Sequence, residues 1–227
     1  MSRKKSSFTS TPCIPKGVVL DMDGLMLNTE REEIKFYVKI SKEMGWPTPQ
    51  NICQKGIGIG DDDVEMLFKN EYGQEYPYKE IWDAVKKQFT IQADKDGIPH
   101  RPGLLMLLDK LDKLGIPMAV ATSTHRLRAE WKLERGGIQN RFKVYVFGDE
   151  VENGKPAPDI FLLAADRLGE KPENCIGFED SPAGLLGLAA AGMPSVFIKD
   201  LVEPPLEILK TVWQRCTDLE EAALLFG

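Results

Sequence analysis

A short apolar run that ends directly in two carboxylates is the feature that most limits how this chain can fold. Residues 17–20 are Gly-Val-Val-Leu, and Asp21 and Asp23 follow them. A continuous Val/Leu run is typical of a strand buried on both faces of a parallel sheet, and ligands bind just beyond the carboxyl ends of such strands. The sequence therefore predicts an α/β fold with Asp21 and Asp23 at the functional edge of its sheet.

Two further apolar runs also end in reactive polar groups. The run at 117–121 leads into Thr122, and a later run leads into Glu179 and Asp180. Between them, a Gly-Lys-Pro-Ala-Pro segment presents Lys155 in front of an expected helix, since proline is favoured at a helix start. If the three runs are parallel strands of one sheet, their carboxylates and hydroxyl meet Lys155 at one edge.

Each of these residues also has a purely structural explanation. An acidic residue after a strand often caps the next helix or turn, Asp23-Gly24 is a common turn dipeptide, and a single lysine is usually solvated. Ser123 or Thr124 is expected to cap the helix that follows. Four such motifs in order are nevertheless much harder to attribute to chance than any one of them.

With these motifs the chain resembles the haloacid dehalogenase-like superfamily, and within it the helical-cap branch of sugar-phosphate phosphatases and β-phosphoglucomutases. The matching motifs are Asp21-Met22-Asp23-Gly24, Thr122, Lys155 and Glu179-Asp180, the last within an extended match over 177–184. The resemblance covers nearly the whole length from about Lys16. It implies a Rossmann-like parallel sheet core with an inserted α-helical cap.

The chemistry of phosphomonoester hydrolysis explains why such residues are needed. The substrate is anionic, so the site must offer a nucleophile, a proton donor and positive charge around the phosphoryl oxygens. Asp21 is expected to be the nucleophile, since a carboxylate can form an aspartyl-phosphate, and Asp23 the general acid and base. The resemblance implies that Thr122 and Lys155 complete the catalytic set, as a hydrogen-bond donor and a cation. Ser123 is a candidate substrate-binding residue.

Clustered carboxylates in one cleft also imply a metal ion. They repel one another and the substrate unless a cation neutralises them, and hard oxygen ligands suit Mg²⁺. The resemblance implies a Mg²⁺ site formed by Asp21 and Asp180, by the backbone carbonyl of Asp23, and by Glu179 as a ligand or an outer partner.

A long helical interval separates the first strand from the alternating strands and helices that begin near Gly115. Apolar residues at helical spacing predict helices in this interval, over 30–44, 61–70 and 79–92. The chain is therefore expected to have three parts, which are a disordered tail (1–15), a catalytic core (16–26 and 102–227) and a helical cap (27–101). A cap inserted after the nucleophile strand can close over the cleft and exclude water.

The cap loop bears on the choice between related reactions. In the family this loop faces the site, which makes Lys55 and Gly56 candidate substrate-binding residues. Its glycines superficially match a dinucleotide-binding turn, but no buried strand precedes them. β-Phosphoglucomutases carry an arginine and a histidine where Ile59 and Glu33 stand here, so hydrolysis is favoured. A mutase is the alternative function, and a phosphate-binding relative without turnover is the third.

Composition excludes several other classes of protein. The net charge of −6 is unlike the basic face that nucleic-acid binding needs, and no stretch approaches the roughly 18 apolar residues of a membrane span. The four cysteines lack metal-like spacing and are expected to be free thiols in a reducing compartment. We therefore expect a monomeric cytoplasmic enzyme that acts on a small phosphorylated molecule, with no nucleic-acid or membrane partner.

Overall fold

The structure is a computed structural model that describes residues 14–47, 53 and 61–227. Within these residues, six strands form one parallel sheet in the order β3-β2-β1-β4-β5-β6. The strands are β1 (Gly17–Leu20), β2 (Met118–Ala121), β3 (Val144–Val146), β4 (Cys175–Glu179), β5 (Ser195–Ile198) and β6 (Gln214–Cys216). The predicted α/β class and the Rossmann-like parallel sheet are confirmed, and β1 lies between β2 and β4.

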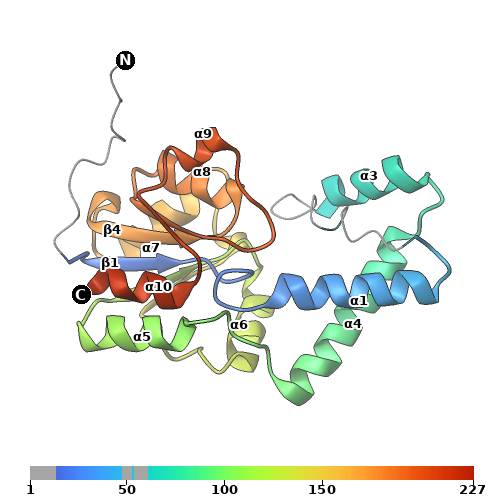
Figure 1. Ribbon diagram of the computed structural model, residues 1–227, viewed down its shortest axis with the longest axis horizontal. Coiled ribbons are helices and arrows are strands. Elements are labelled where there is room, and N and C mark those ends of the chain that lie inside the picture. The colour runs from blue at the N-terminus through green and yellow to red at the C-terminus, as the bar shows by residue number, and fades with distance from the viewer. Residues whose placement is uncertain (1–13, 48–52, 54–60) are drawn as a thin grey trace.

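Helices connect the strands and cover both faces of the sheet (Figure 1). They are α5 (Leu104–Lys113), α6 (Arg126–Arg135), α7 (Asp159–Leu168), α8 (Pro182–Ala190), α9 (Leu206–Leu209) and α10 (Leu219–Ala223), with 3₁₀ turns at Gly148–Glu150, Pro172–Asn174 and Leu224–Phe226. Crossovers of this kind are required because a parallel neighbour cannot be reached by a tight hairpin.

The residues of β1 alternate between two hydrophobic clusters, one on each face of the sheet. Val18 and Leu20 pack in a cluster that includes residues of α5, α6 and α10. Val19 belongs to a second cluster, which it shares with α7. Side chains of a strand point to opposite faces in turn, so a strand covered on both faces needs apolar residues at every position.

Among the described residues, three helices lie outside the layers of the sheet and precede α5 in sequence. They are α1 (Thr29–Glu43), α3 (Asp61–Tyr72) and α4 (Tyr78–Asp96). Their buried aromatic residues, among them Tyr37, Phe68 and Tyr78, form a hydrophobic cluster of their own. A separate core of this kind identifies the three helices as an inserted cap. The end of α4 packs on the sheet side, where Phe89 and Ala93 join the first cluster.

The two connections between the sheet and the cap run side by side. The backbone N–H of Asn28 donates to the carbonyl of Pro99, and that of Arg101 donates to the carbonyl of Met26, at 2.8 and 2.9 Å. The cap limits of 27 and 101 fall in these two connections and stay a prediction. Of the predicted disordered tail, residues 1–13 lie outside the described residues. No described helix combines the length and the apolar composition needed to cross a bilayer.

Candidate active site

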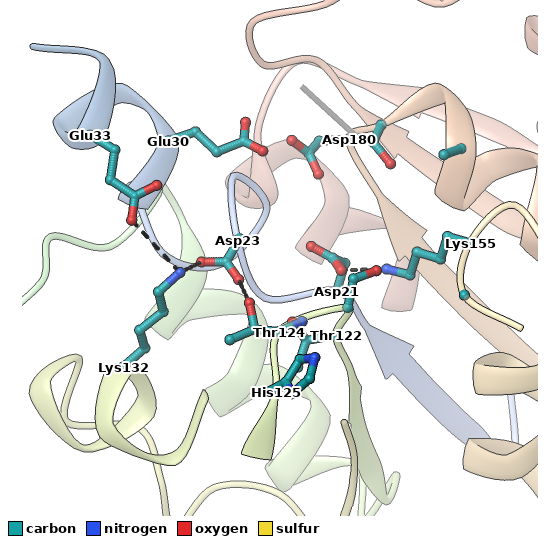
Figure 2. Close-up of a pocket in the computed structure, with 14 residues that line it drawn as sticks. Asp21, Asp23, Glu30, Glu33, Thr122, Thr124, His125, Lys132, Lys155 and Asp180 are labelled. Carbon is teal, nitrogen blue, oxygen red and sulfur yellow. Dashed lines mark hydrogen bonds and ion pairs between the residues drawn. The ribbon is translucent and has the colours of Figure 1, made fainter. Parts of the chain in front are cut away.

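The carboxyl ends of β1, β2 and β4 meet at one edge of the sheet, at a cavity of about 510 Å³ (Figure 2). Asp21 and Asp23 follow β1, Thr122 follows β2 and Asp180 follows β4, and all four line the cavity together with Lys155. The short strands place these residues at one edge because they are parallel and in register. The structure thus brings together five of the residues that the sequence singles out.

Lys155 lies between two carboxylates at the floor of the site. Its Nζ donates to Oδ1 of Asp21, to Oε1 of Glu179 at 2.6 Å and to the carbonyl of Ala121 at 3.2 Å, and its side chain is 6% exposed. Burial alone would lower the pKa of Lys155, but the charges of Asp21 and Glu179 outweigh burial and raise it. Lys155 is therefore a fixed positive charge at the cavity.

Asp21 has an unusual protonation equilibrium for a carboxylic acid. Burial is the largest influence and raises its pKa to about 7, although the charge of Lys155 acts in the opposite direction and Glu179 adds to the rise. A buried carboxylate next to another carboxylate is expected to behave in this way. A further positive charge near Asp21 would favour its ionised, nucleophilic form.

Glu179 is fully buried behind the cavity and organises the turn from β4 into α8. Its Oε2 accepts hydrogen bonds from the backbone N–H groups of Asp180 and Ser181 and from Oγ of Ser181, each at 3.0 Å. A Cβ atom at Gly184 would lie 1.8 Å from Oε1 of Glu179, so glycine is required there. Both oxygens of Glu179 are thus engaged, one by Lys155 and one by this turn.

Asp23 is held by three side chains from different parts of the chain, two of which, Lys132 and Thr124, are drawn in Figure 2. Its Oδ1 accepts from Nζ of Lys132 at 2.6 Å and from Oγ1 of Thr29 at 2.7 Å, and its Oδ2 accepts from Oγ1 of Thr124 at 2.7 Å. Burial alone would raise the pKa of Asp23, but the charge of Lys132 and the three hydrogen bonds lower it. Asp21 and Asp23 therefore have pKa values shifted in opposite directions, although only one residue separates them in the sequence.

A cluster of three acidic side chains adjoins Asp180. Carboxylate oxygens of Asp180, Glu30 on α1 and Asp200 after β5 lie within 4.8 Å of one another. Oε2 of Glu30 and Oδ2 of Asp200 are buried without a hydrogen-bond partner in the described structure. Oδ1 of Asp200 is paired with Arg31 at 2.5 Å and Arg101 at 2.8 Å. Burial and the neighbouring carboxylates raise the pKa values of Glu30 and Asp180 well above their ordinary range.

The residues after β2 differ partly from expectation. Thr122 is buried, and its Oγ1 accepts a hydrogen bond from the backbone N–H of Thr124 at 3.1 Å. Ser123 is exposed and lines the cavity. The predicted helix cap at Ser123 or Thr124 is wrong, because α6 begins one residue later with His125 at its N-cap and the hydroxyl of Thr124 is used by Asp23. Lys55 and Gly56, the predicted cap contacts, lie outside the described residues.

Sequence reasoning missed Lys132, Glu30 and Asp200. A signal existed for Asp200, because it follows the apolar strand β5 as Asp180 follows β4. A weaker signal existed for Lys132, which lies three residues after Ala129 and one before Leu133, both buried on the inner face of α6. No comparable signal marks Glu30, since acidic residues are common in the first turn of any helix.

The chain is similar in sequence to known proteins. The family model for haloacid dehalogenase-like hydrolases matches residues 15–192. A protein of Thermotoga maritima named phosphorylated carbohydrates phosphatase is 29% identical over 187 residues, which are 80% of this chain and 84% of that protein.

Solved structures show the same fold. A haloacid dehalogenase family hydrolase from Deinococcus radiodurans, with bound phosphate and sodium, superposes with a TM-score of 0.77 at 22% identity and covers 92% of this chain and 96% of its own. A β-phosphoglucomutase from Clostridium difficile superposes with a TM-score of 0.71 at 21% identity and covers 91% of this chain and 92% of its own. At these identities the likeness concerns the fold alone.

Proposed function

Because the chain belongs to the haloacid dehalogenase-like hydrolases, we propose that it is a Mg²⁺-dependent phosphatase that hydrolyses small phosphomonoesters through an aspartyl-phosphate on Asp21. The observation that carries this proposal is the contact of Lys155 with Asp21 at the cavity, with Asp23 two residues further on. A nucleophile, a fixed cation and a second carboxyl group are what phosphoryl transfer needs. The name of the Thermotoga maritima relative supports a sugar phosphate as the substrate.

The acidic cluster supports the proposed divalent cation. The partnerless buried oxygen of Glu30 lies beside Asp180, and hard oxygen donors of this kind suit Mg²⁺. Asp21, Asp180 and the backbone carbonyl of Asp23 are the proposed ligands, with Glu30 next to them. Since both oxygens of Glu179 are engaged by protein donors, Glu179 is proposed as an outer partner. When bound, the ion would neutralise these carboxylates and polarise the phosphoryl group.

The proposed reaction has two steps. An oxygen of Asp21 attacks phosphorus, the bond from phosphorus to the leaving oxygen breaks, and that oxygen takes a proton from Asp23. Water then attacks the phosphorus of the aspartyl-phosphate, gives a proton to Asp23 and releases inorganic phosphate with free Asp21. Thr122 and Lys155 are proposed to hold the phosphoryl oxygens in both steps, which is electrostatic preorganisation.

Phosphate release from a panel of phosphorylated metabolites, with Mg²⁺ and with a chelator, tests the proposal. Asp21→Asn is expected to abolish release while the protein stays folded, and Asp166→Asn, at an exposed position of α7, is the matched control. Release that is independent of Asp21 would contradict the proposal. In a parallel reaction, conversion of β-glucose 1-phosphate to glucose 6-phosphate, dependent on a trace of glucose 1,6-bisphosphate, would favour the mutase instead.

We also propose that the protein acts as a monomer in the cytoplasm, without a nucleic-acid partner, and that its cap spans residues 27–101. The net charge of −6 supports the part that concerns nucleic acid. Lys55, Gly56 and Ser123 are the proposed substrate contacts. Light scattering of the purified protein tests the oligomeric state.

A further inference from the structure

The cavity contains a second buried lysine that the proposed reaction does not use. Lys132 comes from α6, its side chain is 8% exposed, and its Nζ lies 2.6 Å from Oδ1 of Asp23. The two residues are 109 positions apart in the sequence, so the tertiary fold alone brings them together. A buried ammonium group must be paired and hydrogen-bonded to be tolerated. Asp23 supplies that pairing, and Glu33 on the cap helix α1 lies 4.0 Å from the same Nζ.

The two oxygens of Asp23 have different partners. Oδ1 faces Lys132, whose ammonium group can donate hydrogen bonds but not accept them, and it also accepts from Thr29. Oδ2 faces the hydroxyl of Thr124, which can either donate or accept. A proton is therefore excluded from Oδ1 but can be accommodated on Oδ2. In the view of Figure 2, Lys132 meets Asp23 from the side opposite Asp21.

We infer that Lys132 is a positioning residue for Asp23, which fixes Oδ1 and thereby assigns proton exchange to Oδ2. The inference rests on the proposed phosphatase function. In the first step the bond between Oδ2 and its proton breaks and the leaving oxygen takes the proton. In the second step Oδ2 takes a proton from the attacking water. Lys132 acts through Asp23 in both steps and keeps its own protons.

Two substrates that differ in their need for a proton test this role. The alkoxide of an alkyl phosphate, such as a sugar phosphate, must be protonated as it leaves, whereas p-nitrophenolate leaves unprotonated. General acid catalysis contributes about 10²–10⁴-fold, so Lys132→Met is expected to lower kcat/KM for the alkyl phosphate by roughly 10²-fold and for p-nitrophenyl phosphate by less than about threefold. The quantity kcat/KM is used because it reports the first transfer step in both cases.

Methionine suits the test because it is apolar and of similar length, and Asp23 keeps its bonds to Thr29 and Thr124. Activity on p-nitrophenyl phosphate shows that the variant is folded. Lys132→Gln repeats the test if the methionine variant does not fold. Lys132→Arg keeps charge and donors and is expected to recover part of the alkyl activity. Lys87→Met, at an exposed position of α4, is the control and is expected to leave both rates unchanged.

A double variant identifies the route of the effect. If Lys132 acts through Asp23, adding Lys132→Met to Asp23→Asn causes no further loss on the alkyl phosphate, since effects on one shared group are not additive. Equal losses on both substrates, or additive losses in the double variant, would overturn the inference. If the wild-type protein hydrolyses neither substrate with Mg²⁺ present, the proposed function itself is wrong and the inference falls with it.

Discussion

Lys155→Met removes a cation from between two buried carboxylates. The ammonium group of Lys155 contacts Asp21, Glu179 and the carbonyl of Ala121, and its side chain is 6% exposed. Methionine fills a similar volume but leaves Asp21 and Glu179 without this positive charge. Glu179 cannot turn away to water, because its other oxygen is fixed by the turn into α8.

The size of the effect follows from these contacts. Removing one partner of a buried ion pair costs about 3–5 kcal/mol, because the charge that remains is shielded from water. Asp21 can avoid part of this cost by taking up a proton, since its pKa is already about 7 with Lys155 in place. We therefore expect the free energy of unfolding to fall by an amount at the lower end of this range, about 3 kcal/mol near neutral pH. For a chain of this size that corresponds to a fall of about 6–12 °C in Tm.

The expected loss depends on pH in a definite direction. Without Lys155 the pKa of Asp21 in the folded protein rises further. A carboxyl group whose pKa is raised by folding contributes stability at low pH, and that contribution is lost as the pH rises through the raised pKa. The difference between the variant and the wild type is therefore larger at high pH than at low pH. Urea unfolding of the chelated proteins at pH 5, 7 and 9 measures it.

Lys171→Met, at an exposed position, is the matched control and is expected to change stability by less than about 0.5 kcal/mol. A Lys155→Met protein as stable as the wild type, or a loss that is equal at all three pH values, would refute the electrostatic reasoning. The same variant is expected to hydrolyse phosphomonoesters at least about 10²-fold more slowly.

Gly184→Ala is expected to destabilise the protein by about 1–3 kcal/mol, because its Cβ would lie 1.8 Å from Glu179, and an unchanged urea midpoint would show that Glu179 can move. Glu30→Gln is expected to raise the Mg²⁺ concentration needed for half-maximal thermal stabilisation by about tenfold, and an unchanged midpoint would place Glu30 away from the ion. Relative to the Asp21→Asn variant, the metal-free wild type is expected to lose stability as the pH rises from about 4 to about 7, because burial raises the pKa of Asp21. A difference in urea midpoint between the two proteins that stays constant over this pH range would contradict this expectation.

The sheet could be predicted from the sequence because its central strands are buried on both faces. The run predicted from about Lys16 to Asp21 corresponds to β1, Gly17–Leu20, and every residue of that strand is buried. The cap helices were predicted from helical spacing, but their limits were less accurate. The helix predicted over 79–92 continues to Asp96, since Phe89 and Ala93 pack against the sheet side and extend the buried stripe.

The side chains around the acids could not be predicted in the same way, because tertiary contacts decide their roles. Thr124 stands where a helix cap is expected, yet its hydroxyl bonds to Asp23, while Asp149 accepts the hydrogen bond from the backbone N–H of Arg126 near the start of α6. Lys132 belongs to a helix with several basic residues, and its burial depends on the carboxylate of Asp23, which follows the distant strand β1. The local sequence indicates where a helix starts, but it does not indicate which polar side chains of that helix are buried.

The distribution of positive charge among the acids gives a further argument for the position of the proposed cation. Asp21 is paired with Lys155, Asp23 with Lys132, and Asp200 with two arginines. In the part of the chain that the structure describes, Asp180 and Glu30 have no cationic side chain within salt-bridge distance, although both lie at the cavity and have raised pKa values. Two adjacent carboxyl groups that share burial but lack a counter-ion attract a divalent cation more strongly than acids already neutralised by lysine. The unpaired acids therefore favour the Asp180 side of the cavity for the ion, and leave the Lys132 side free for proton transfer by Asp23.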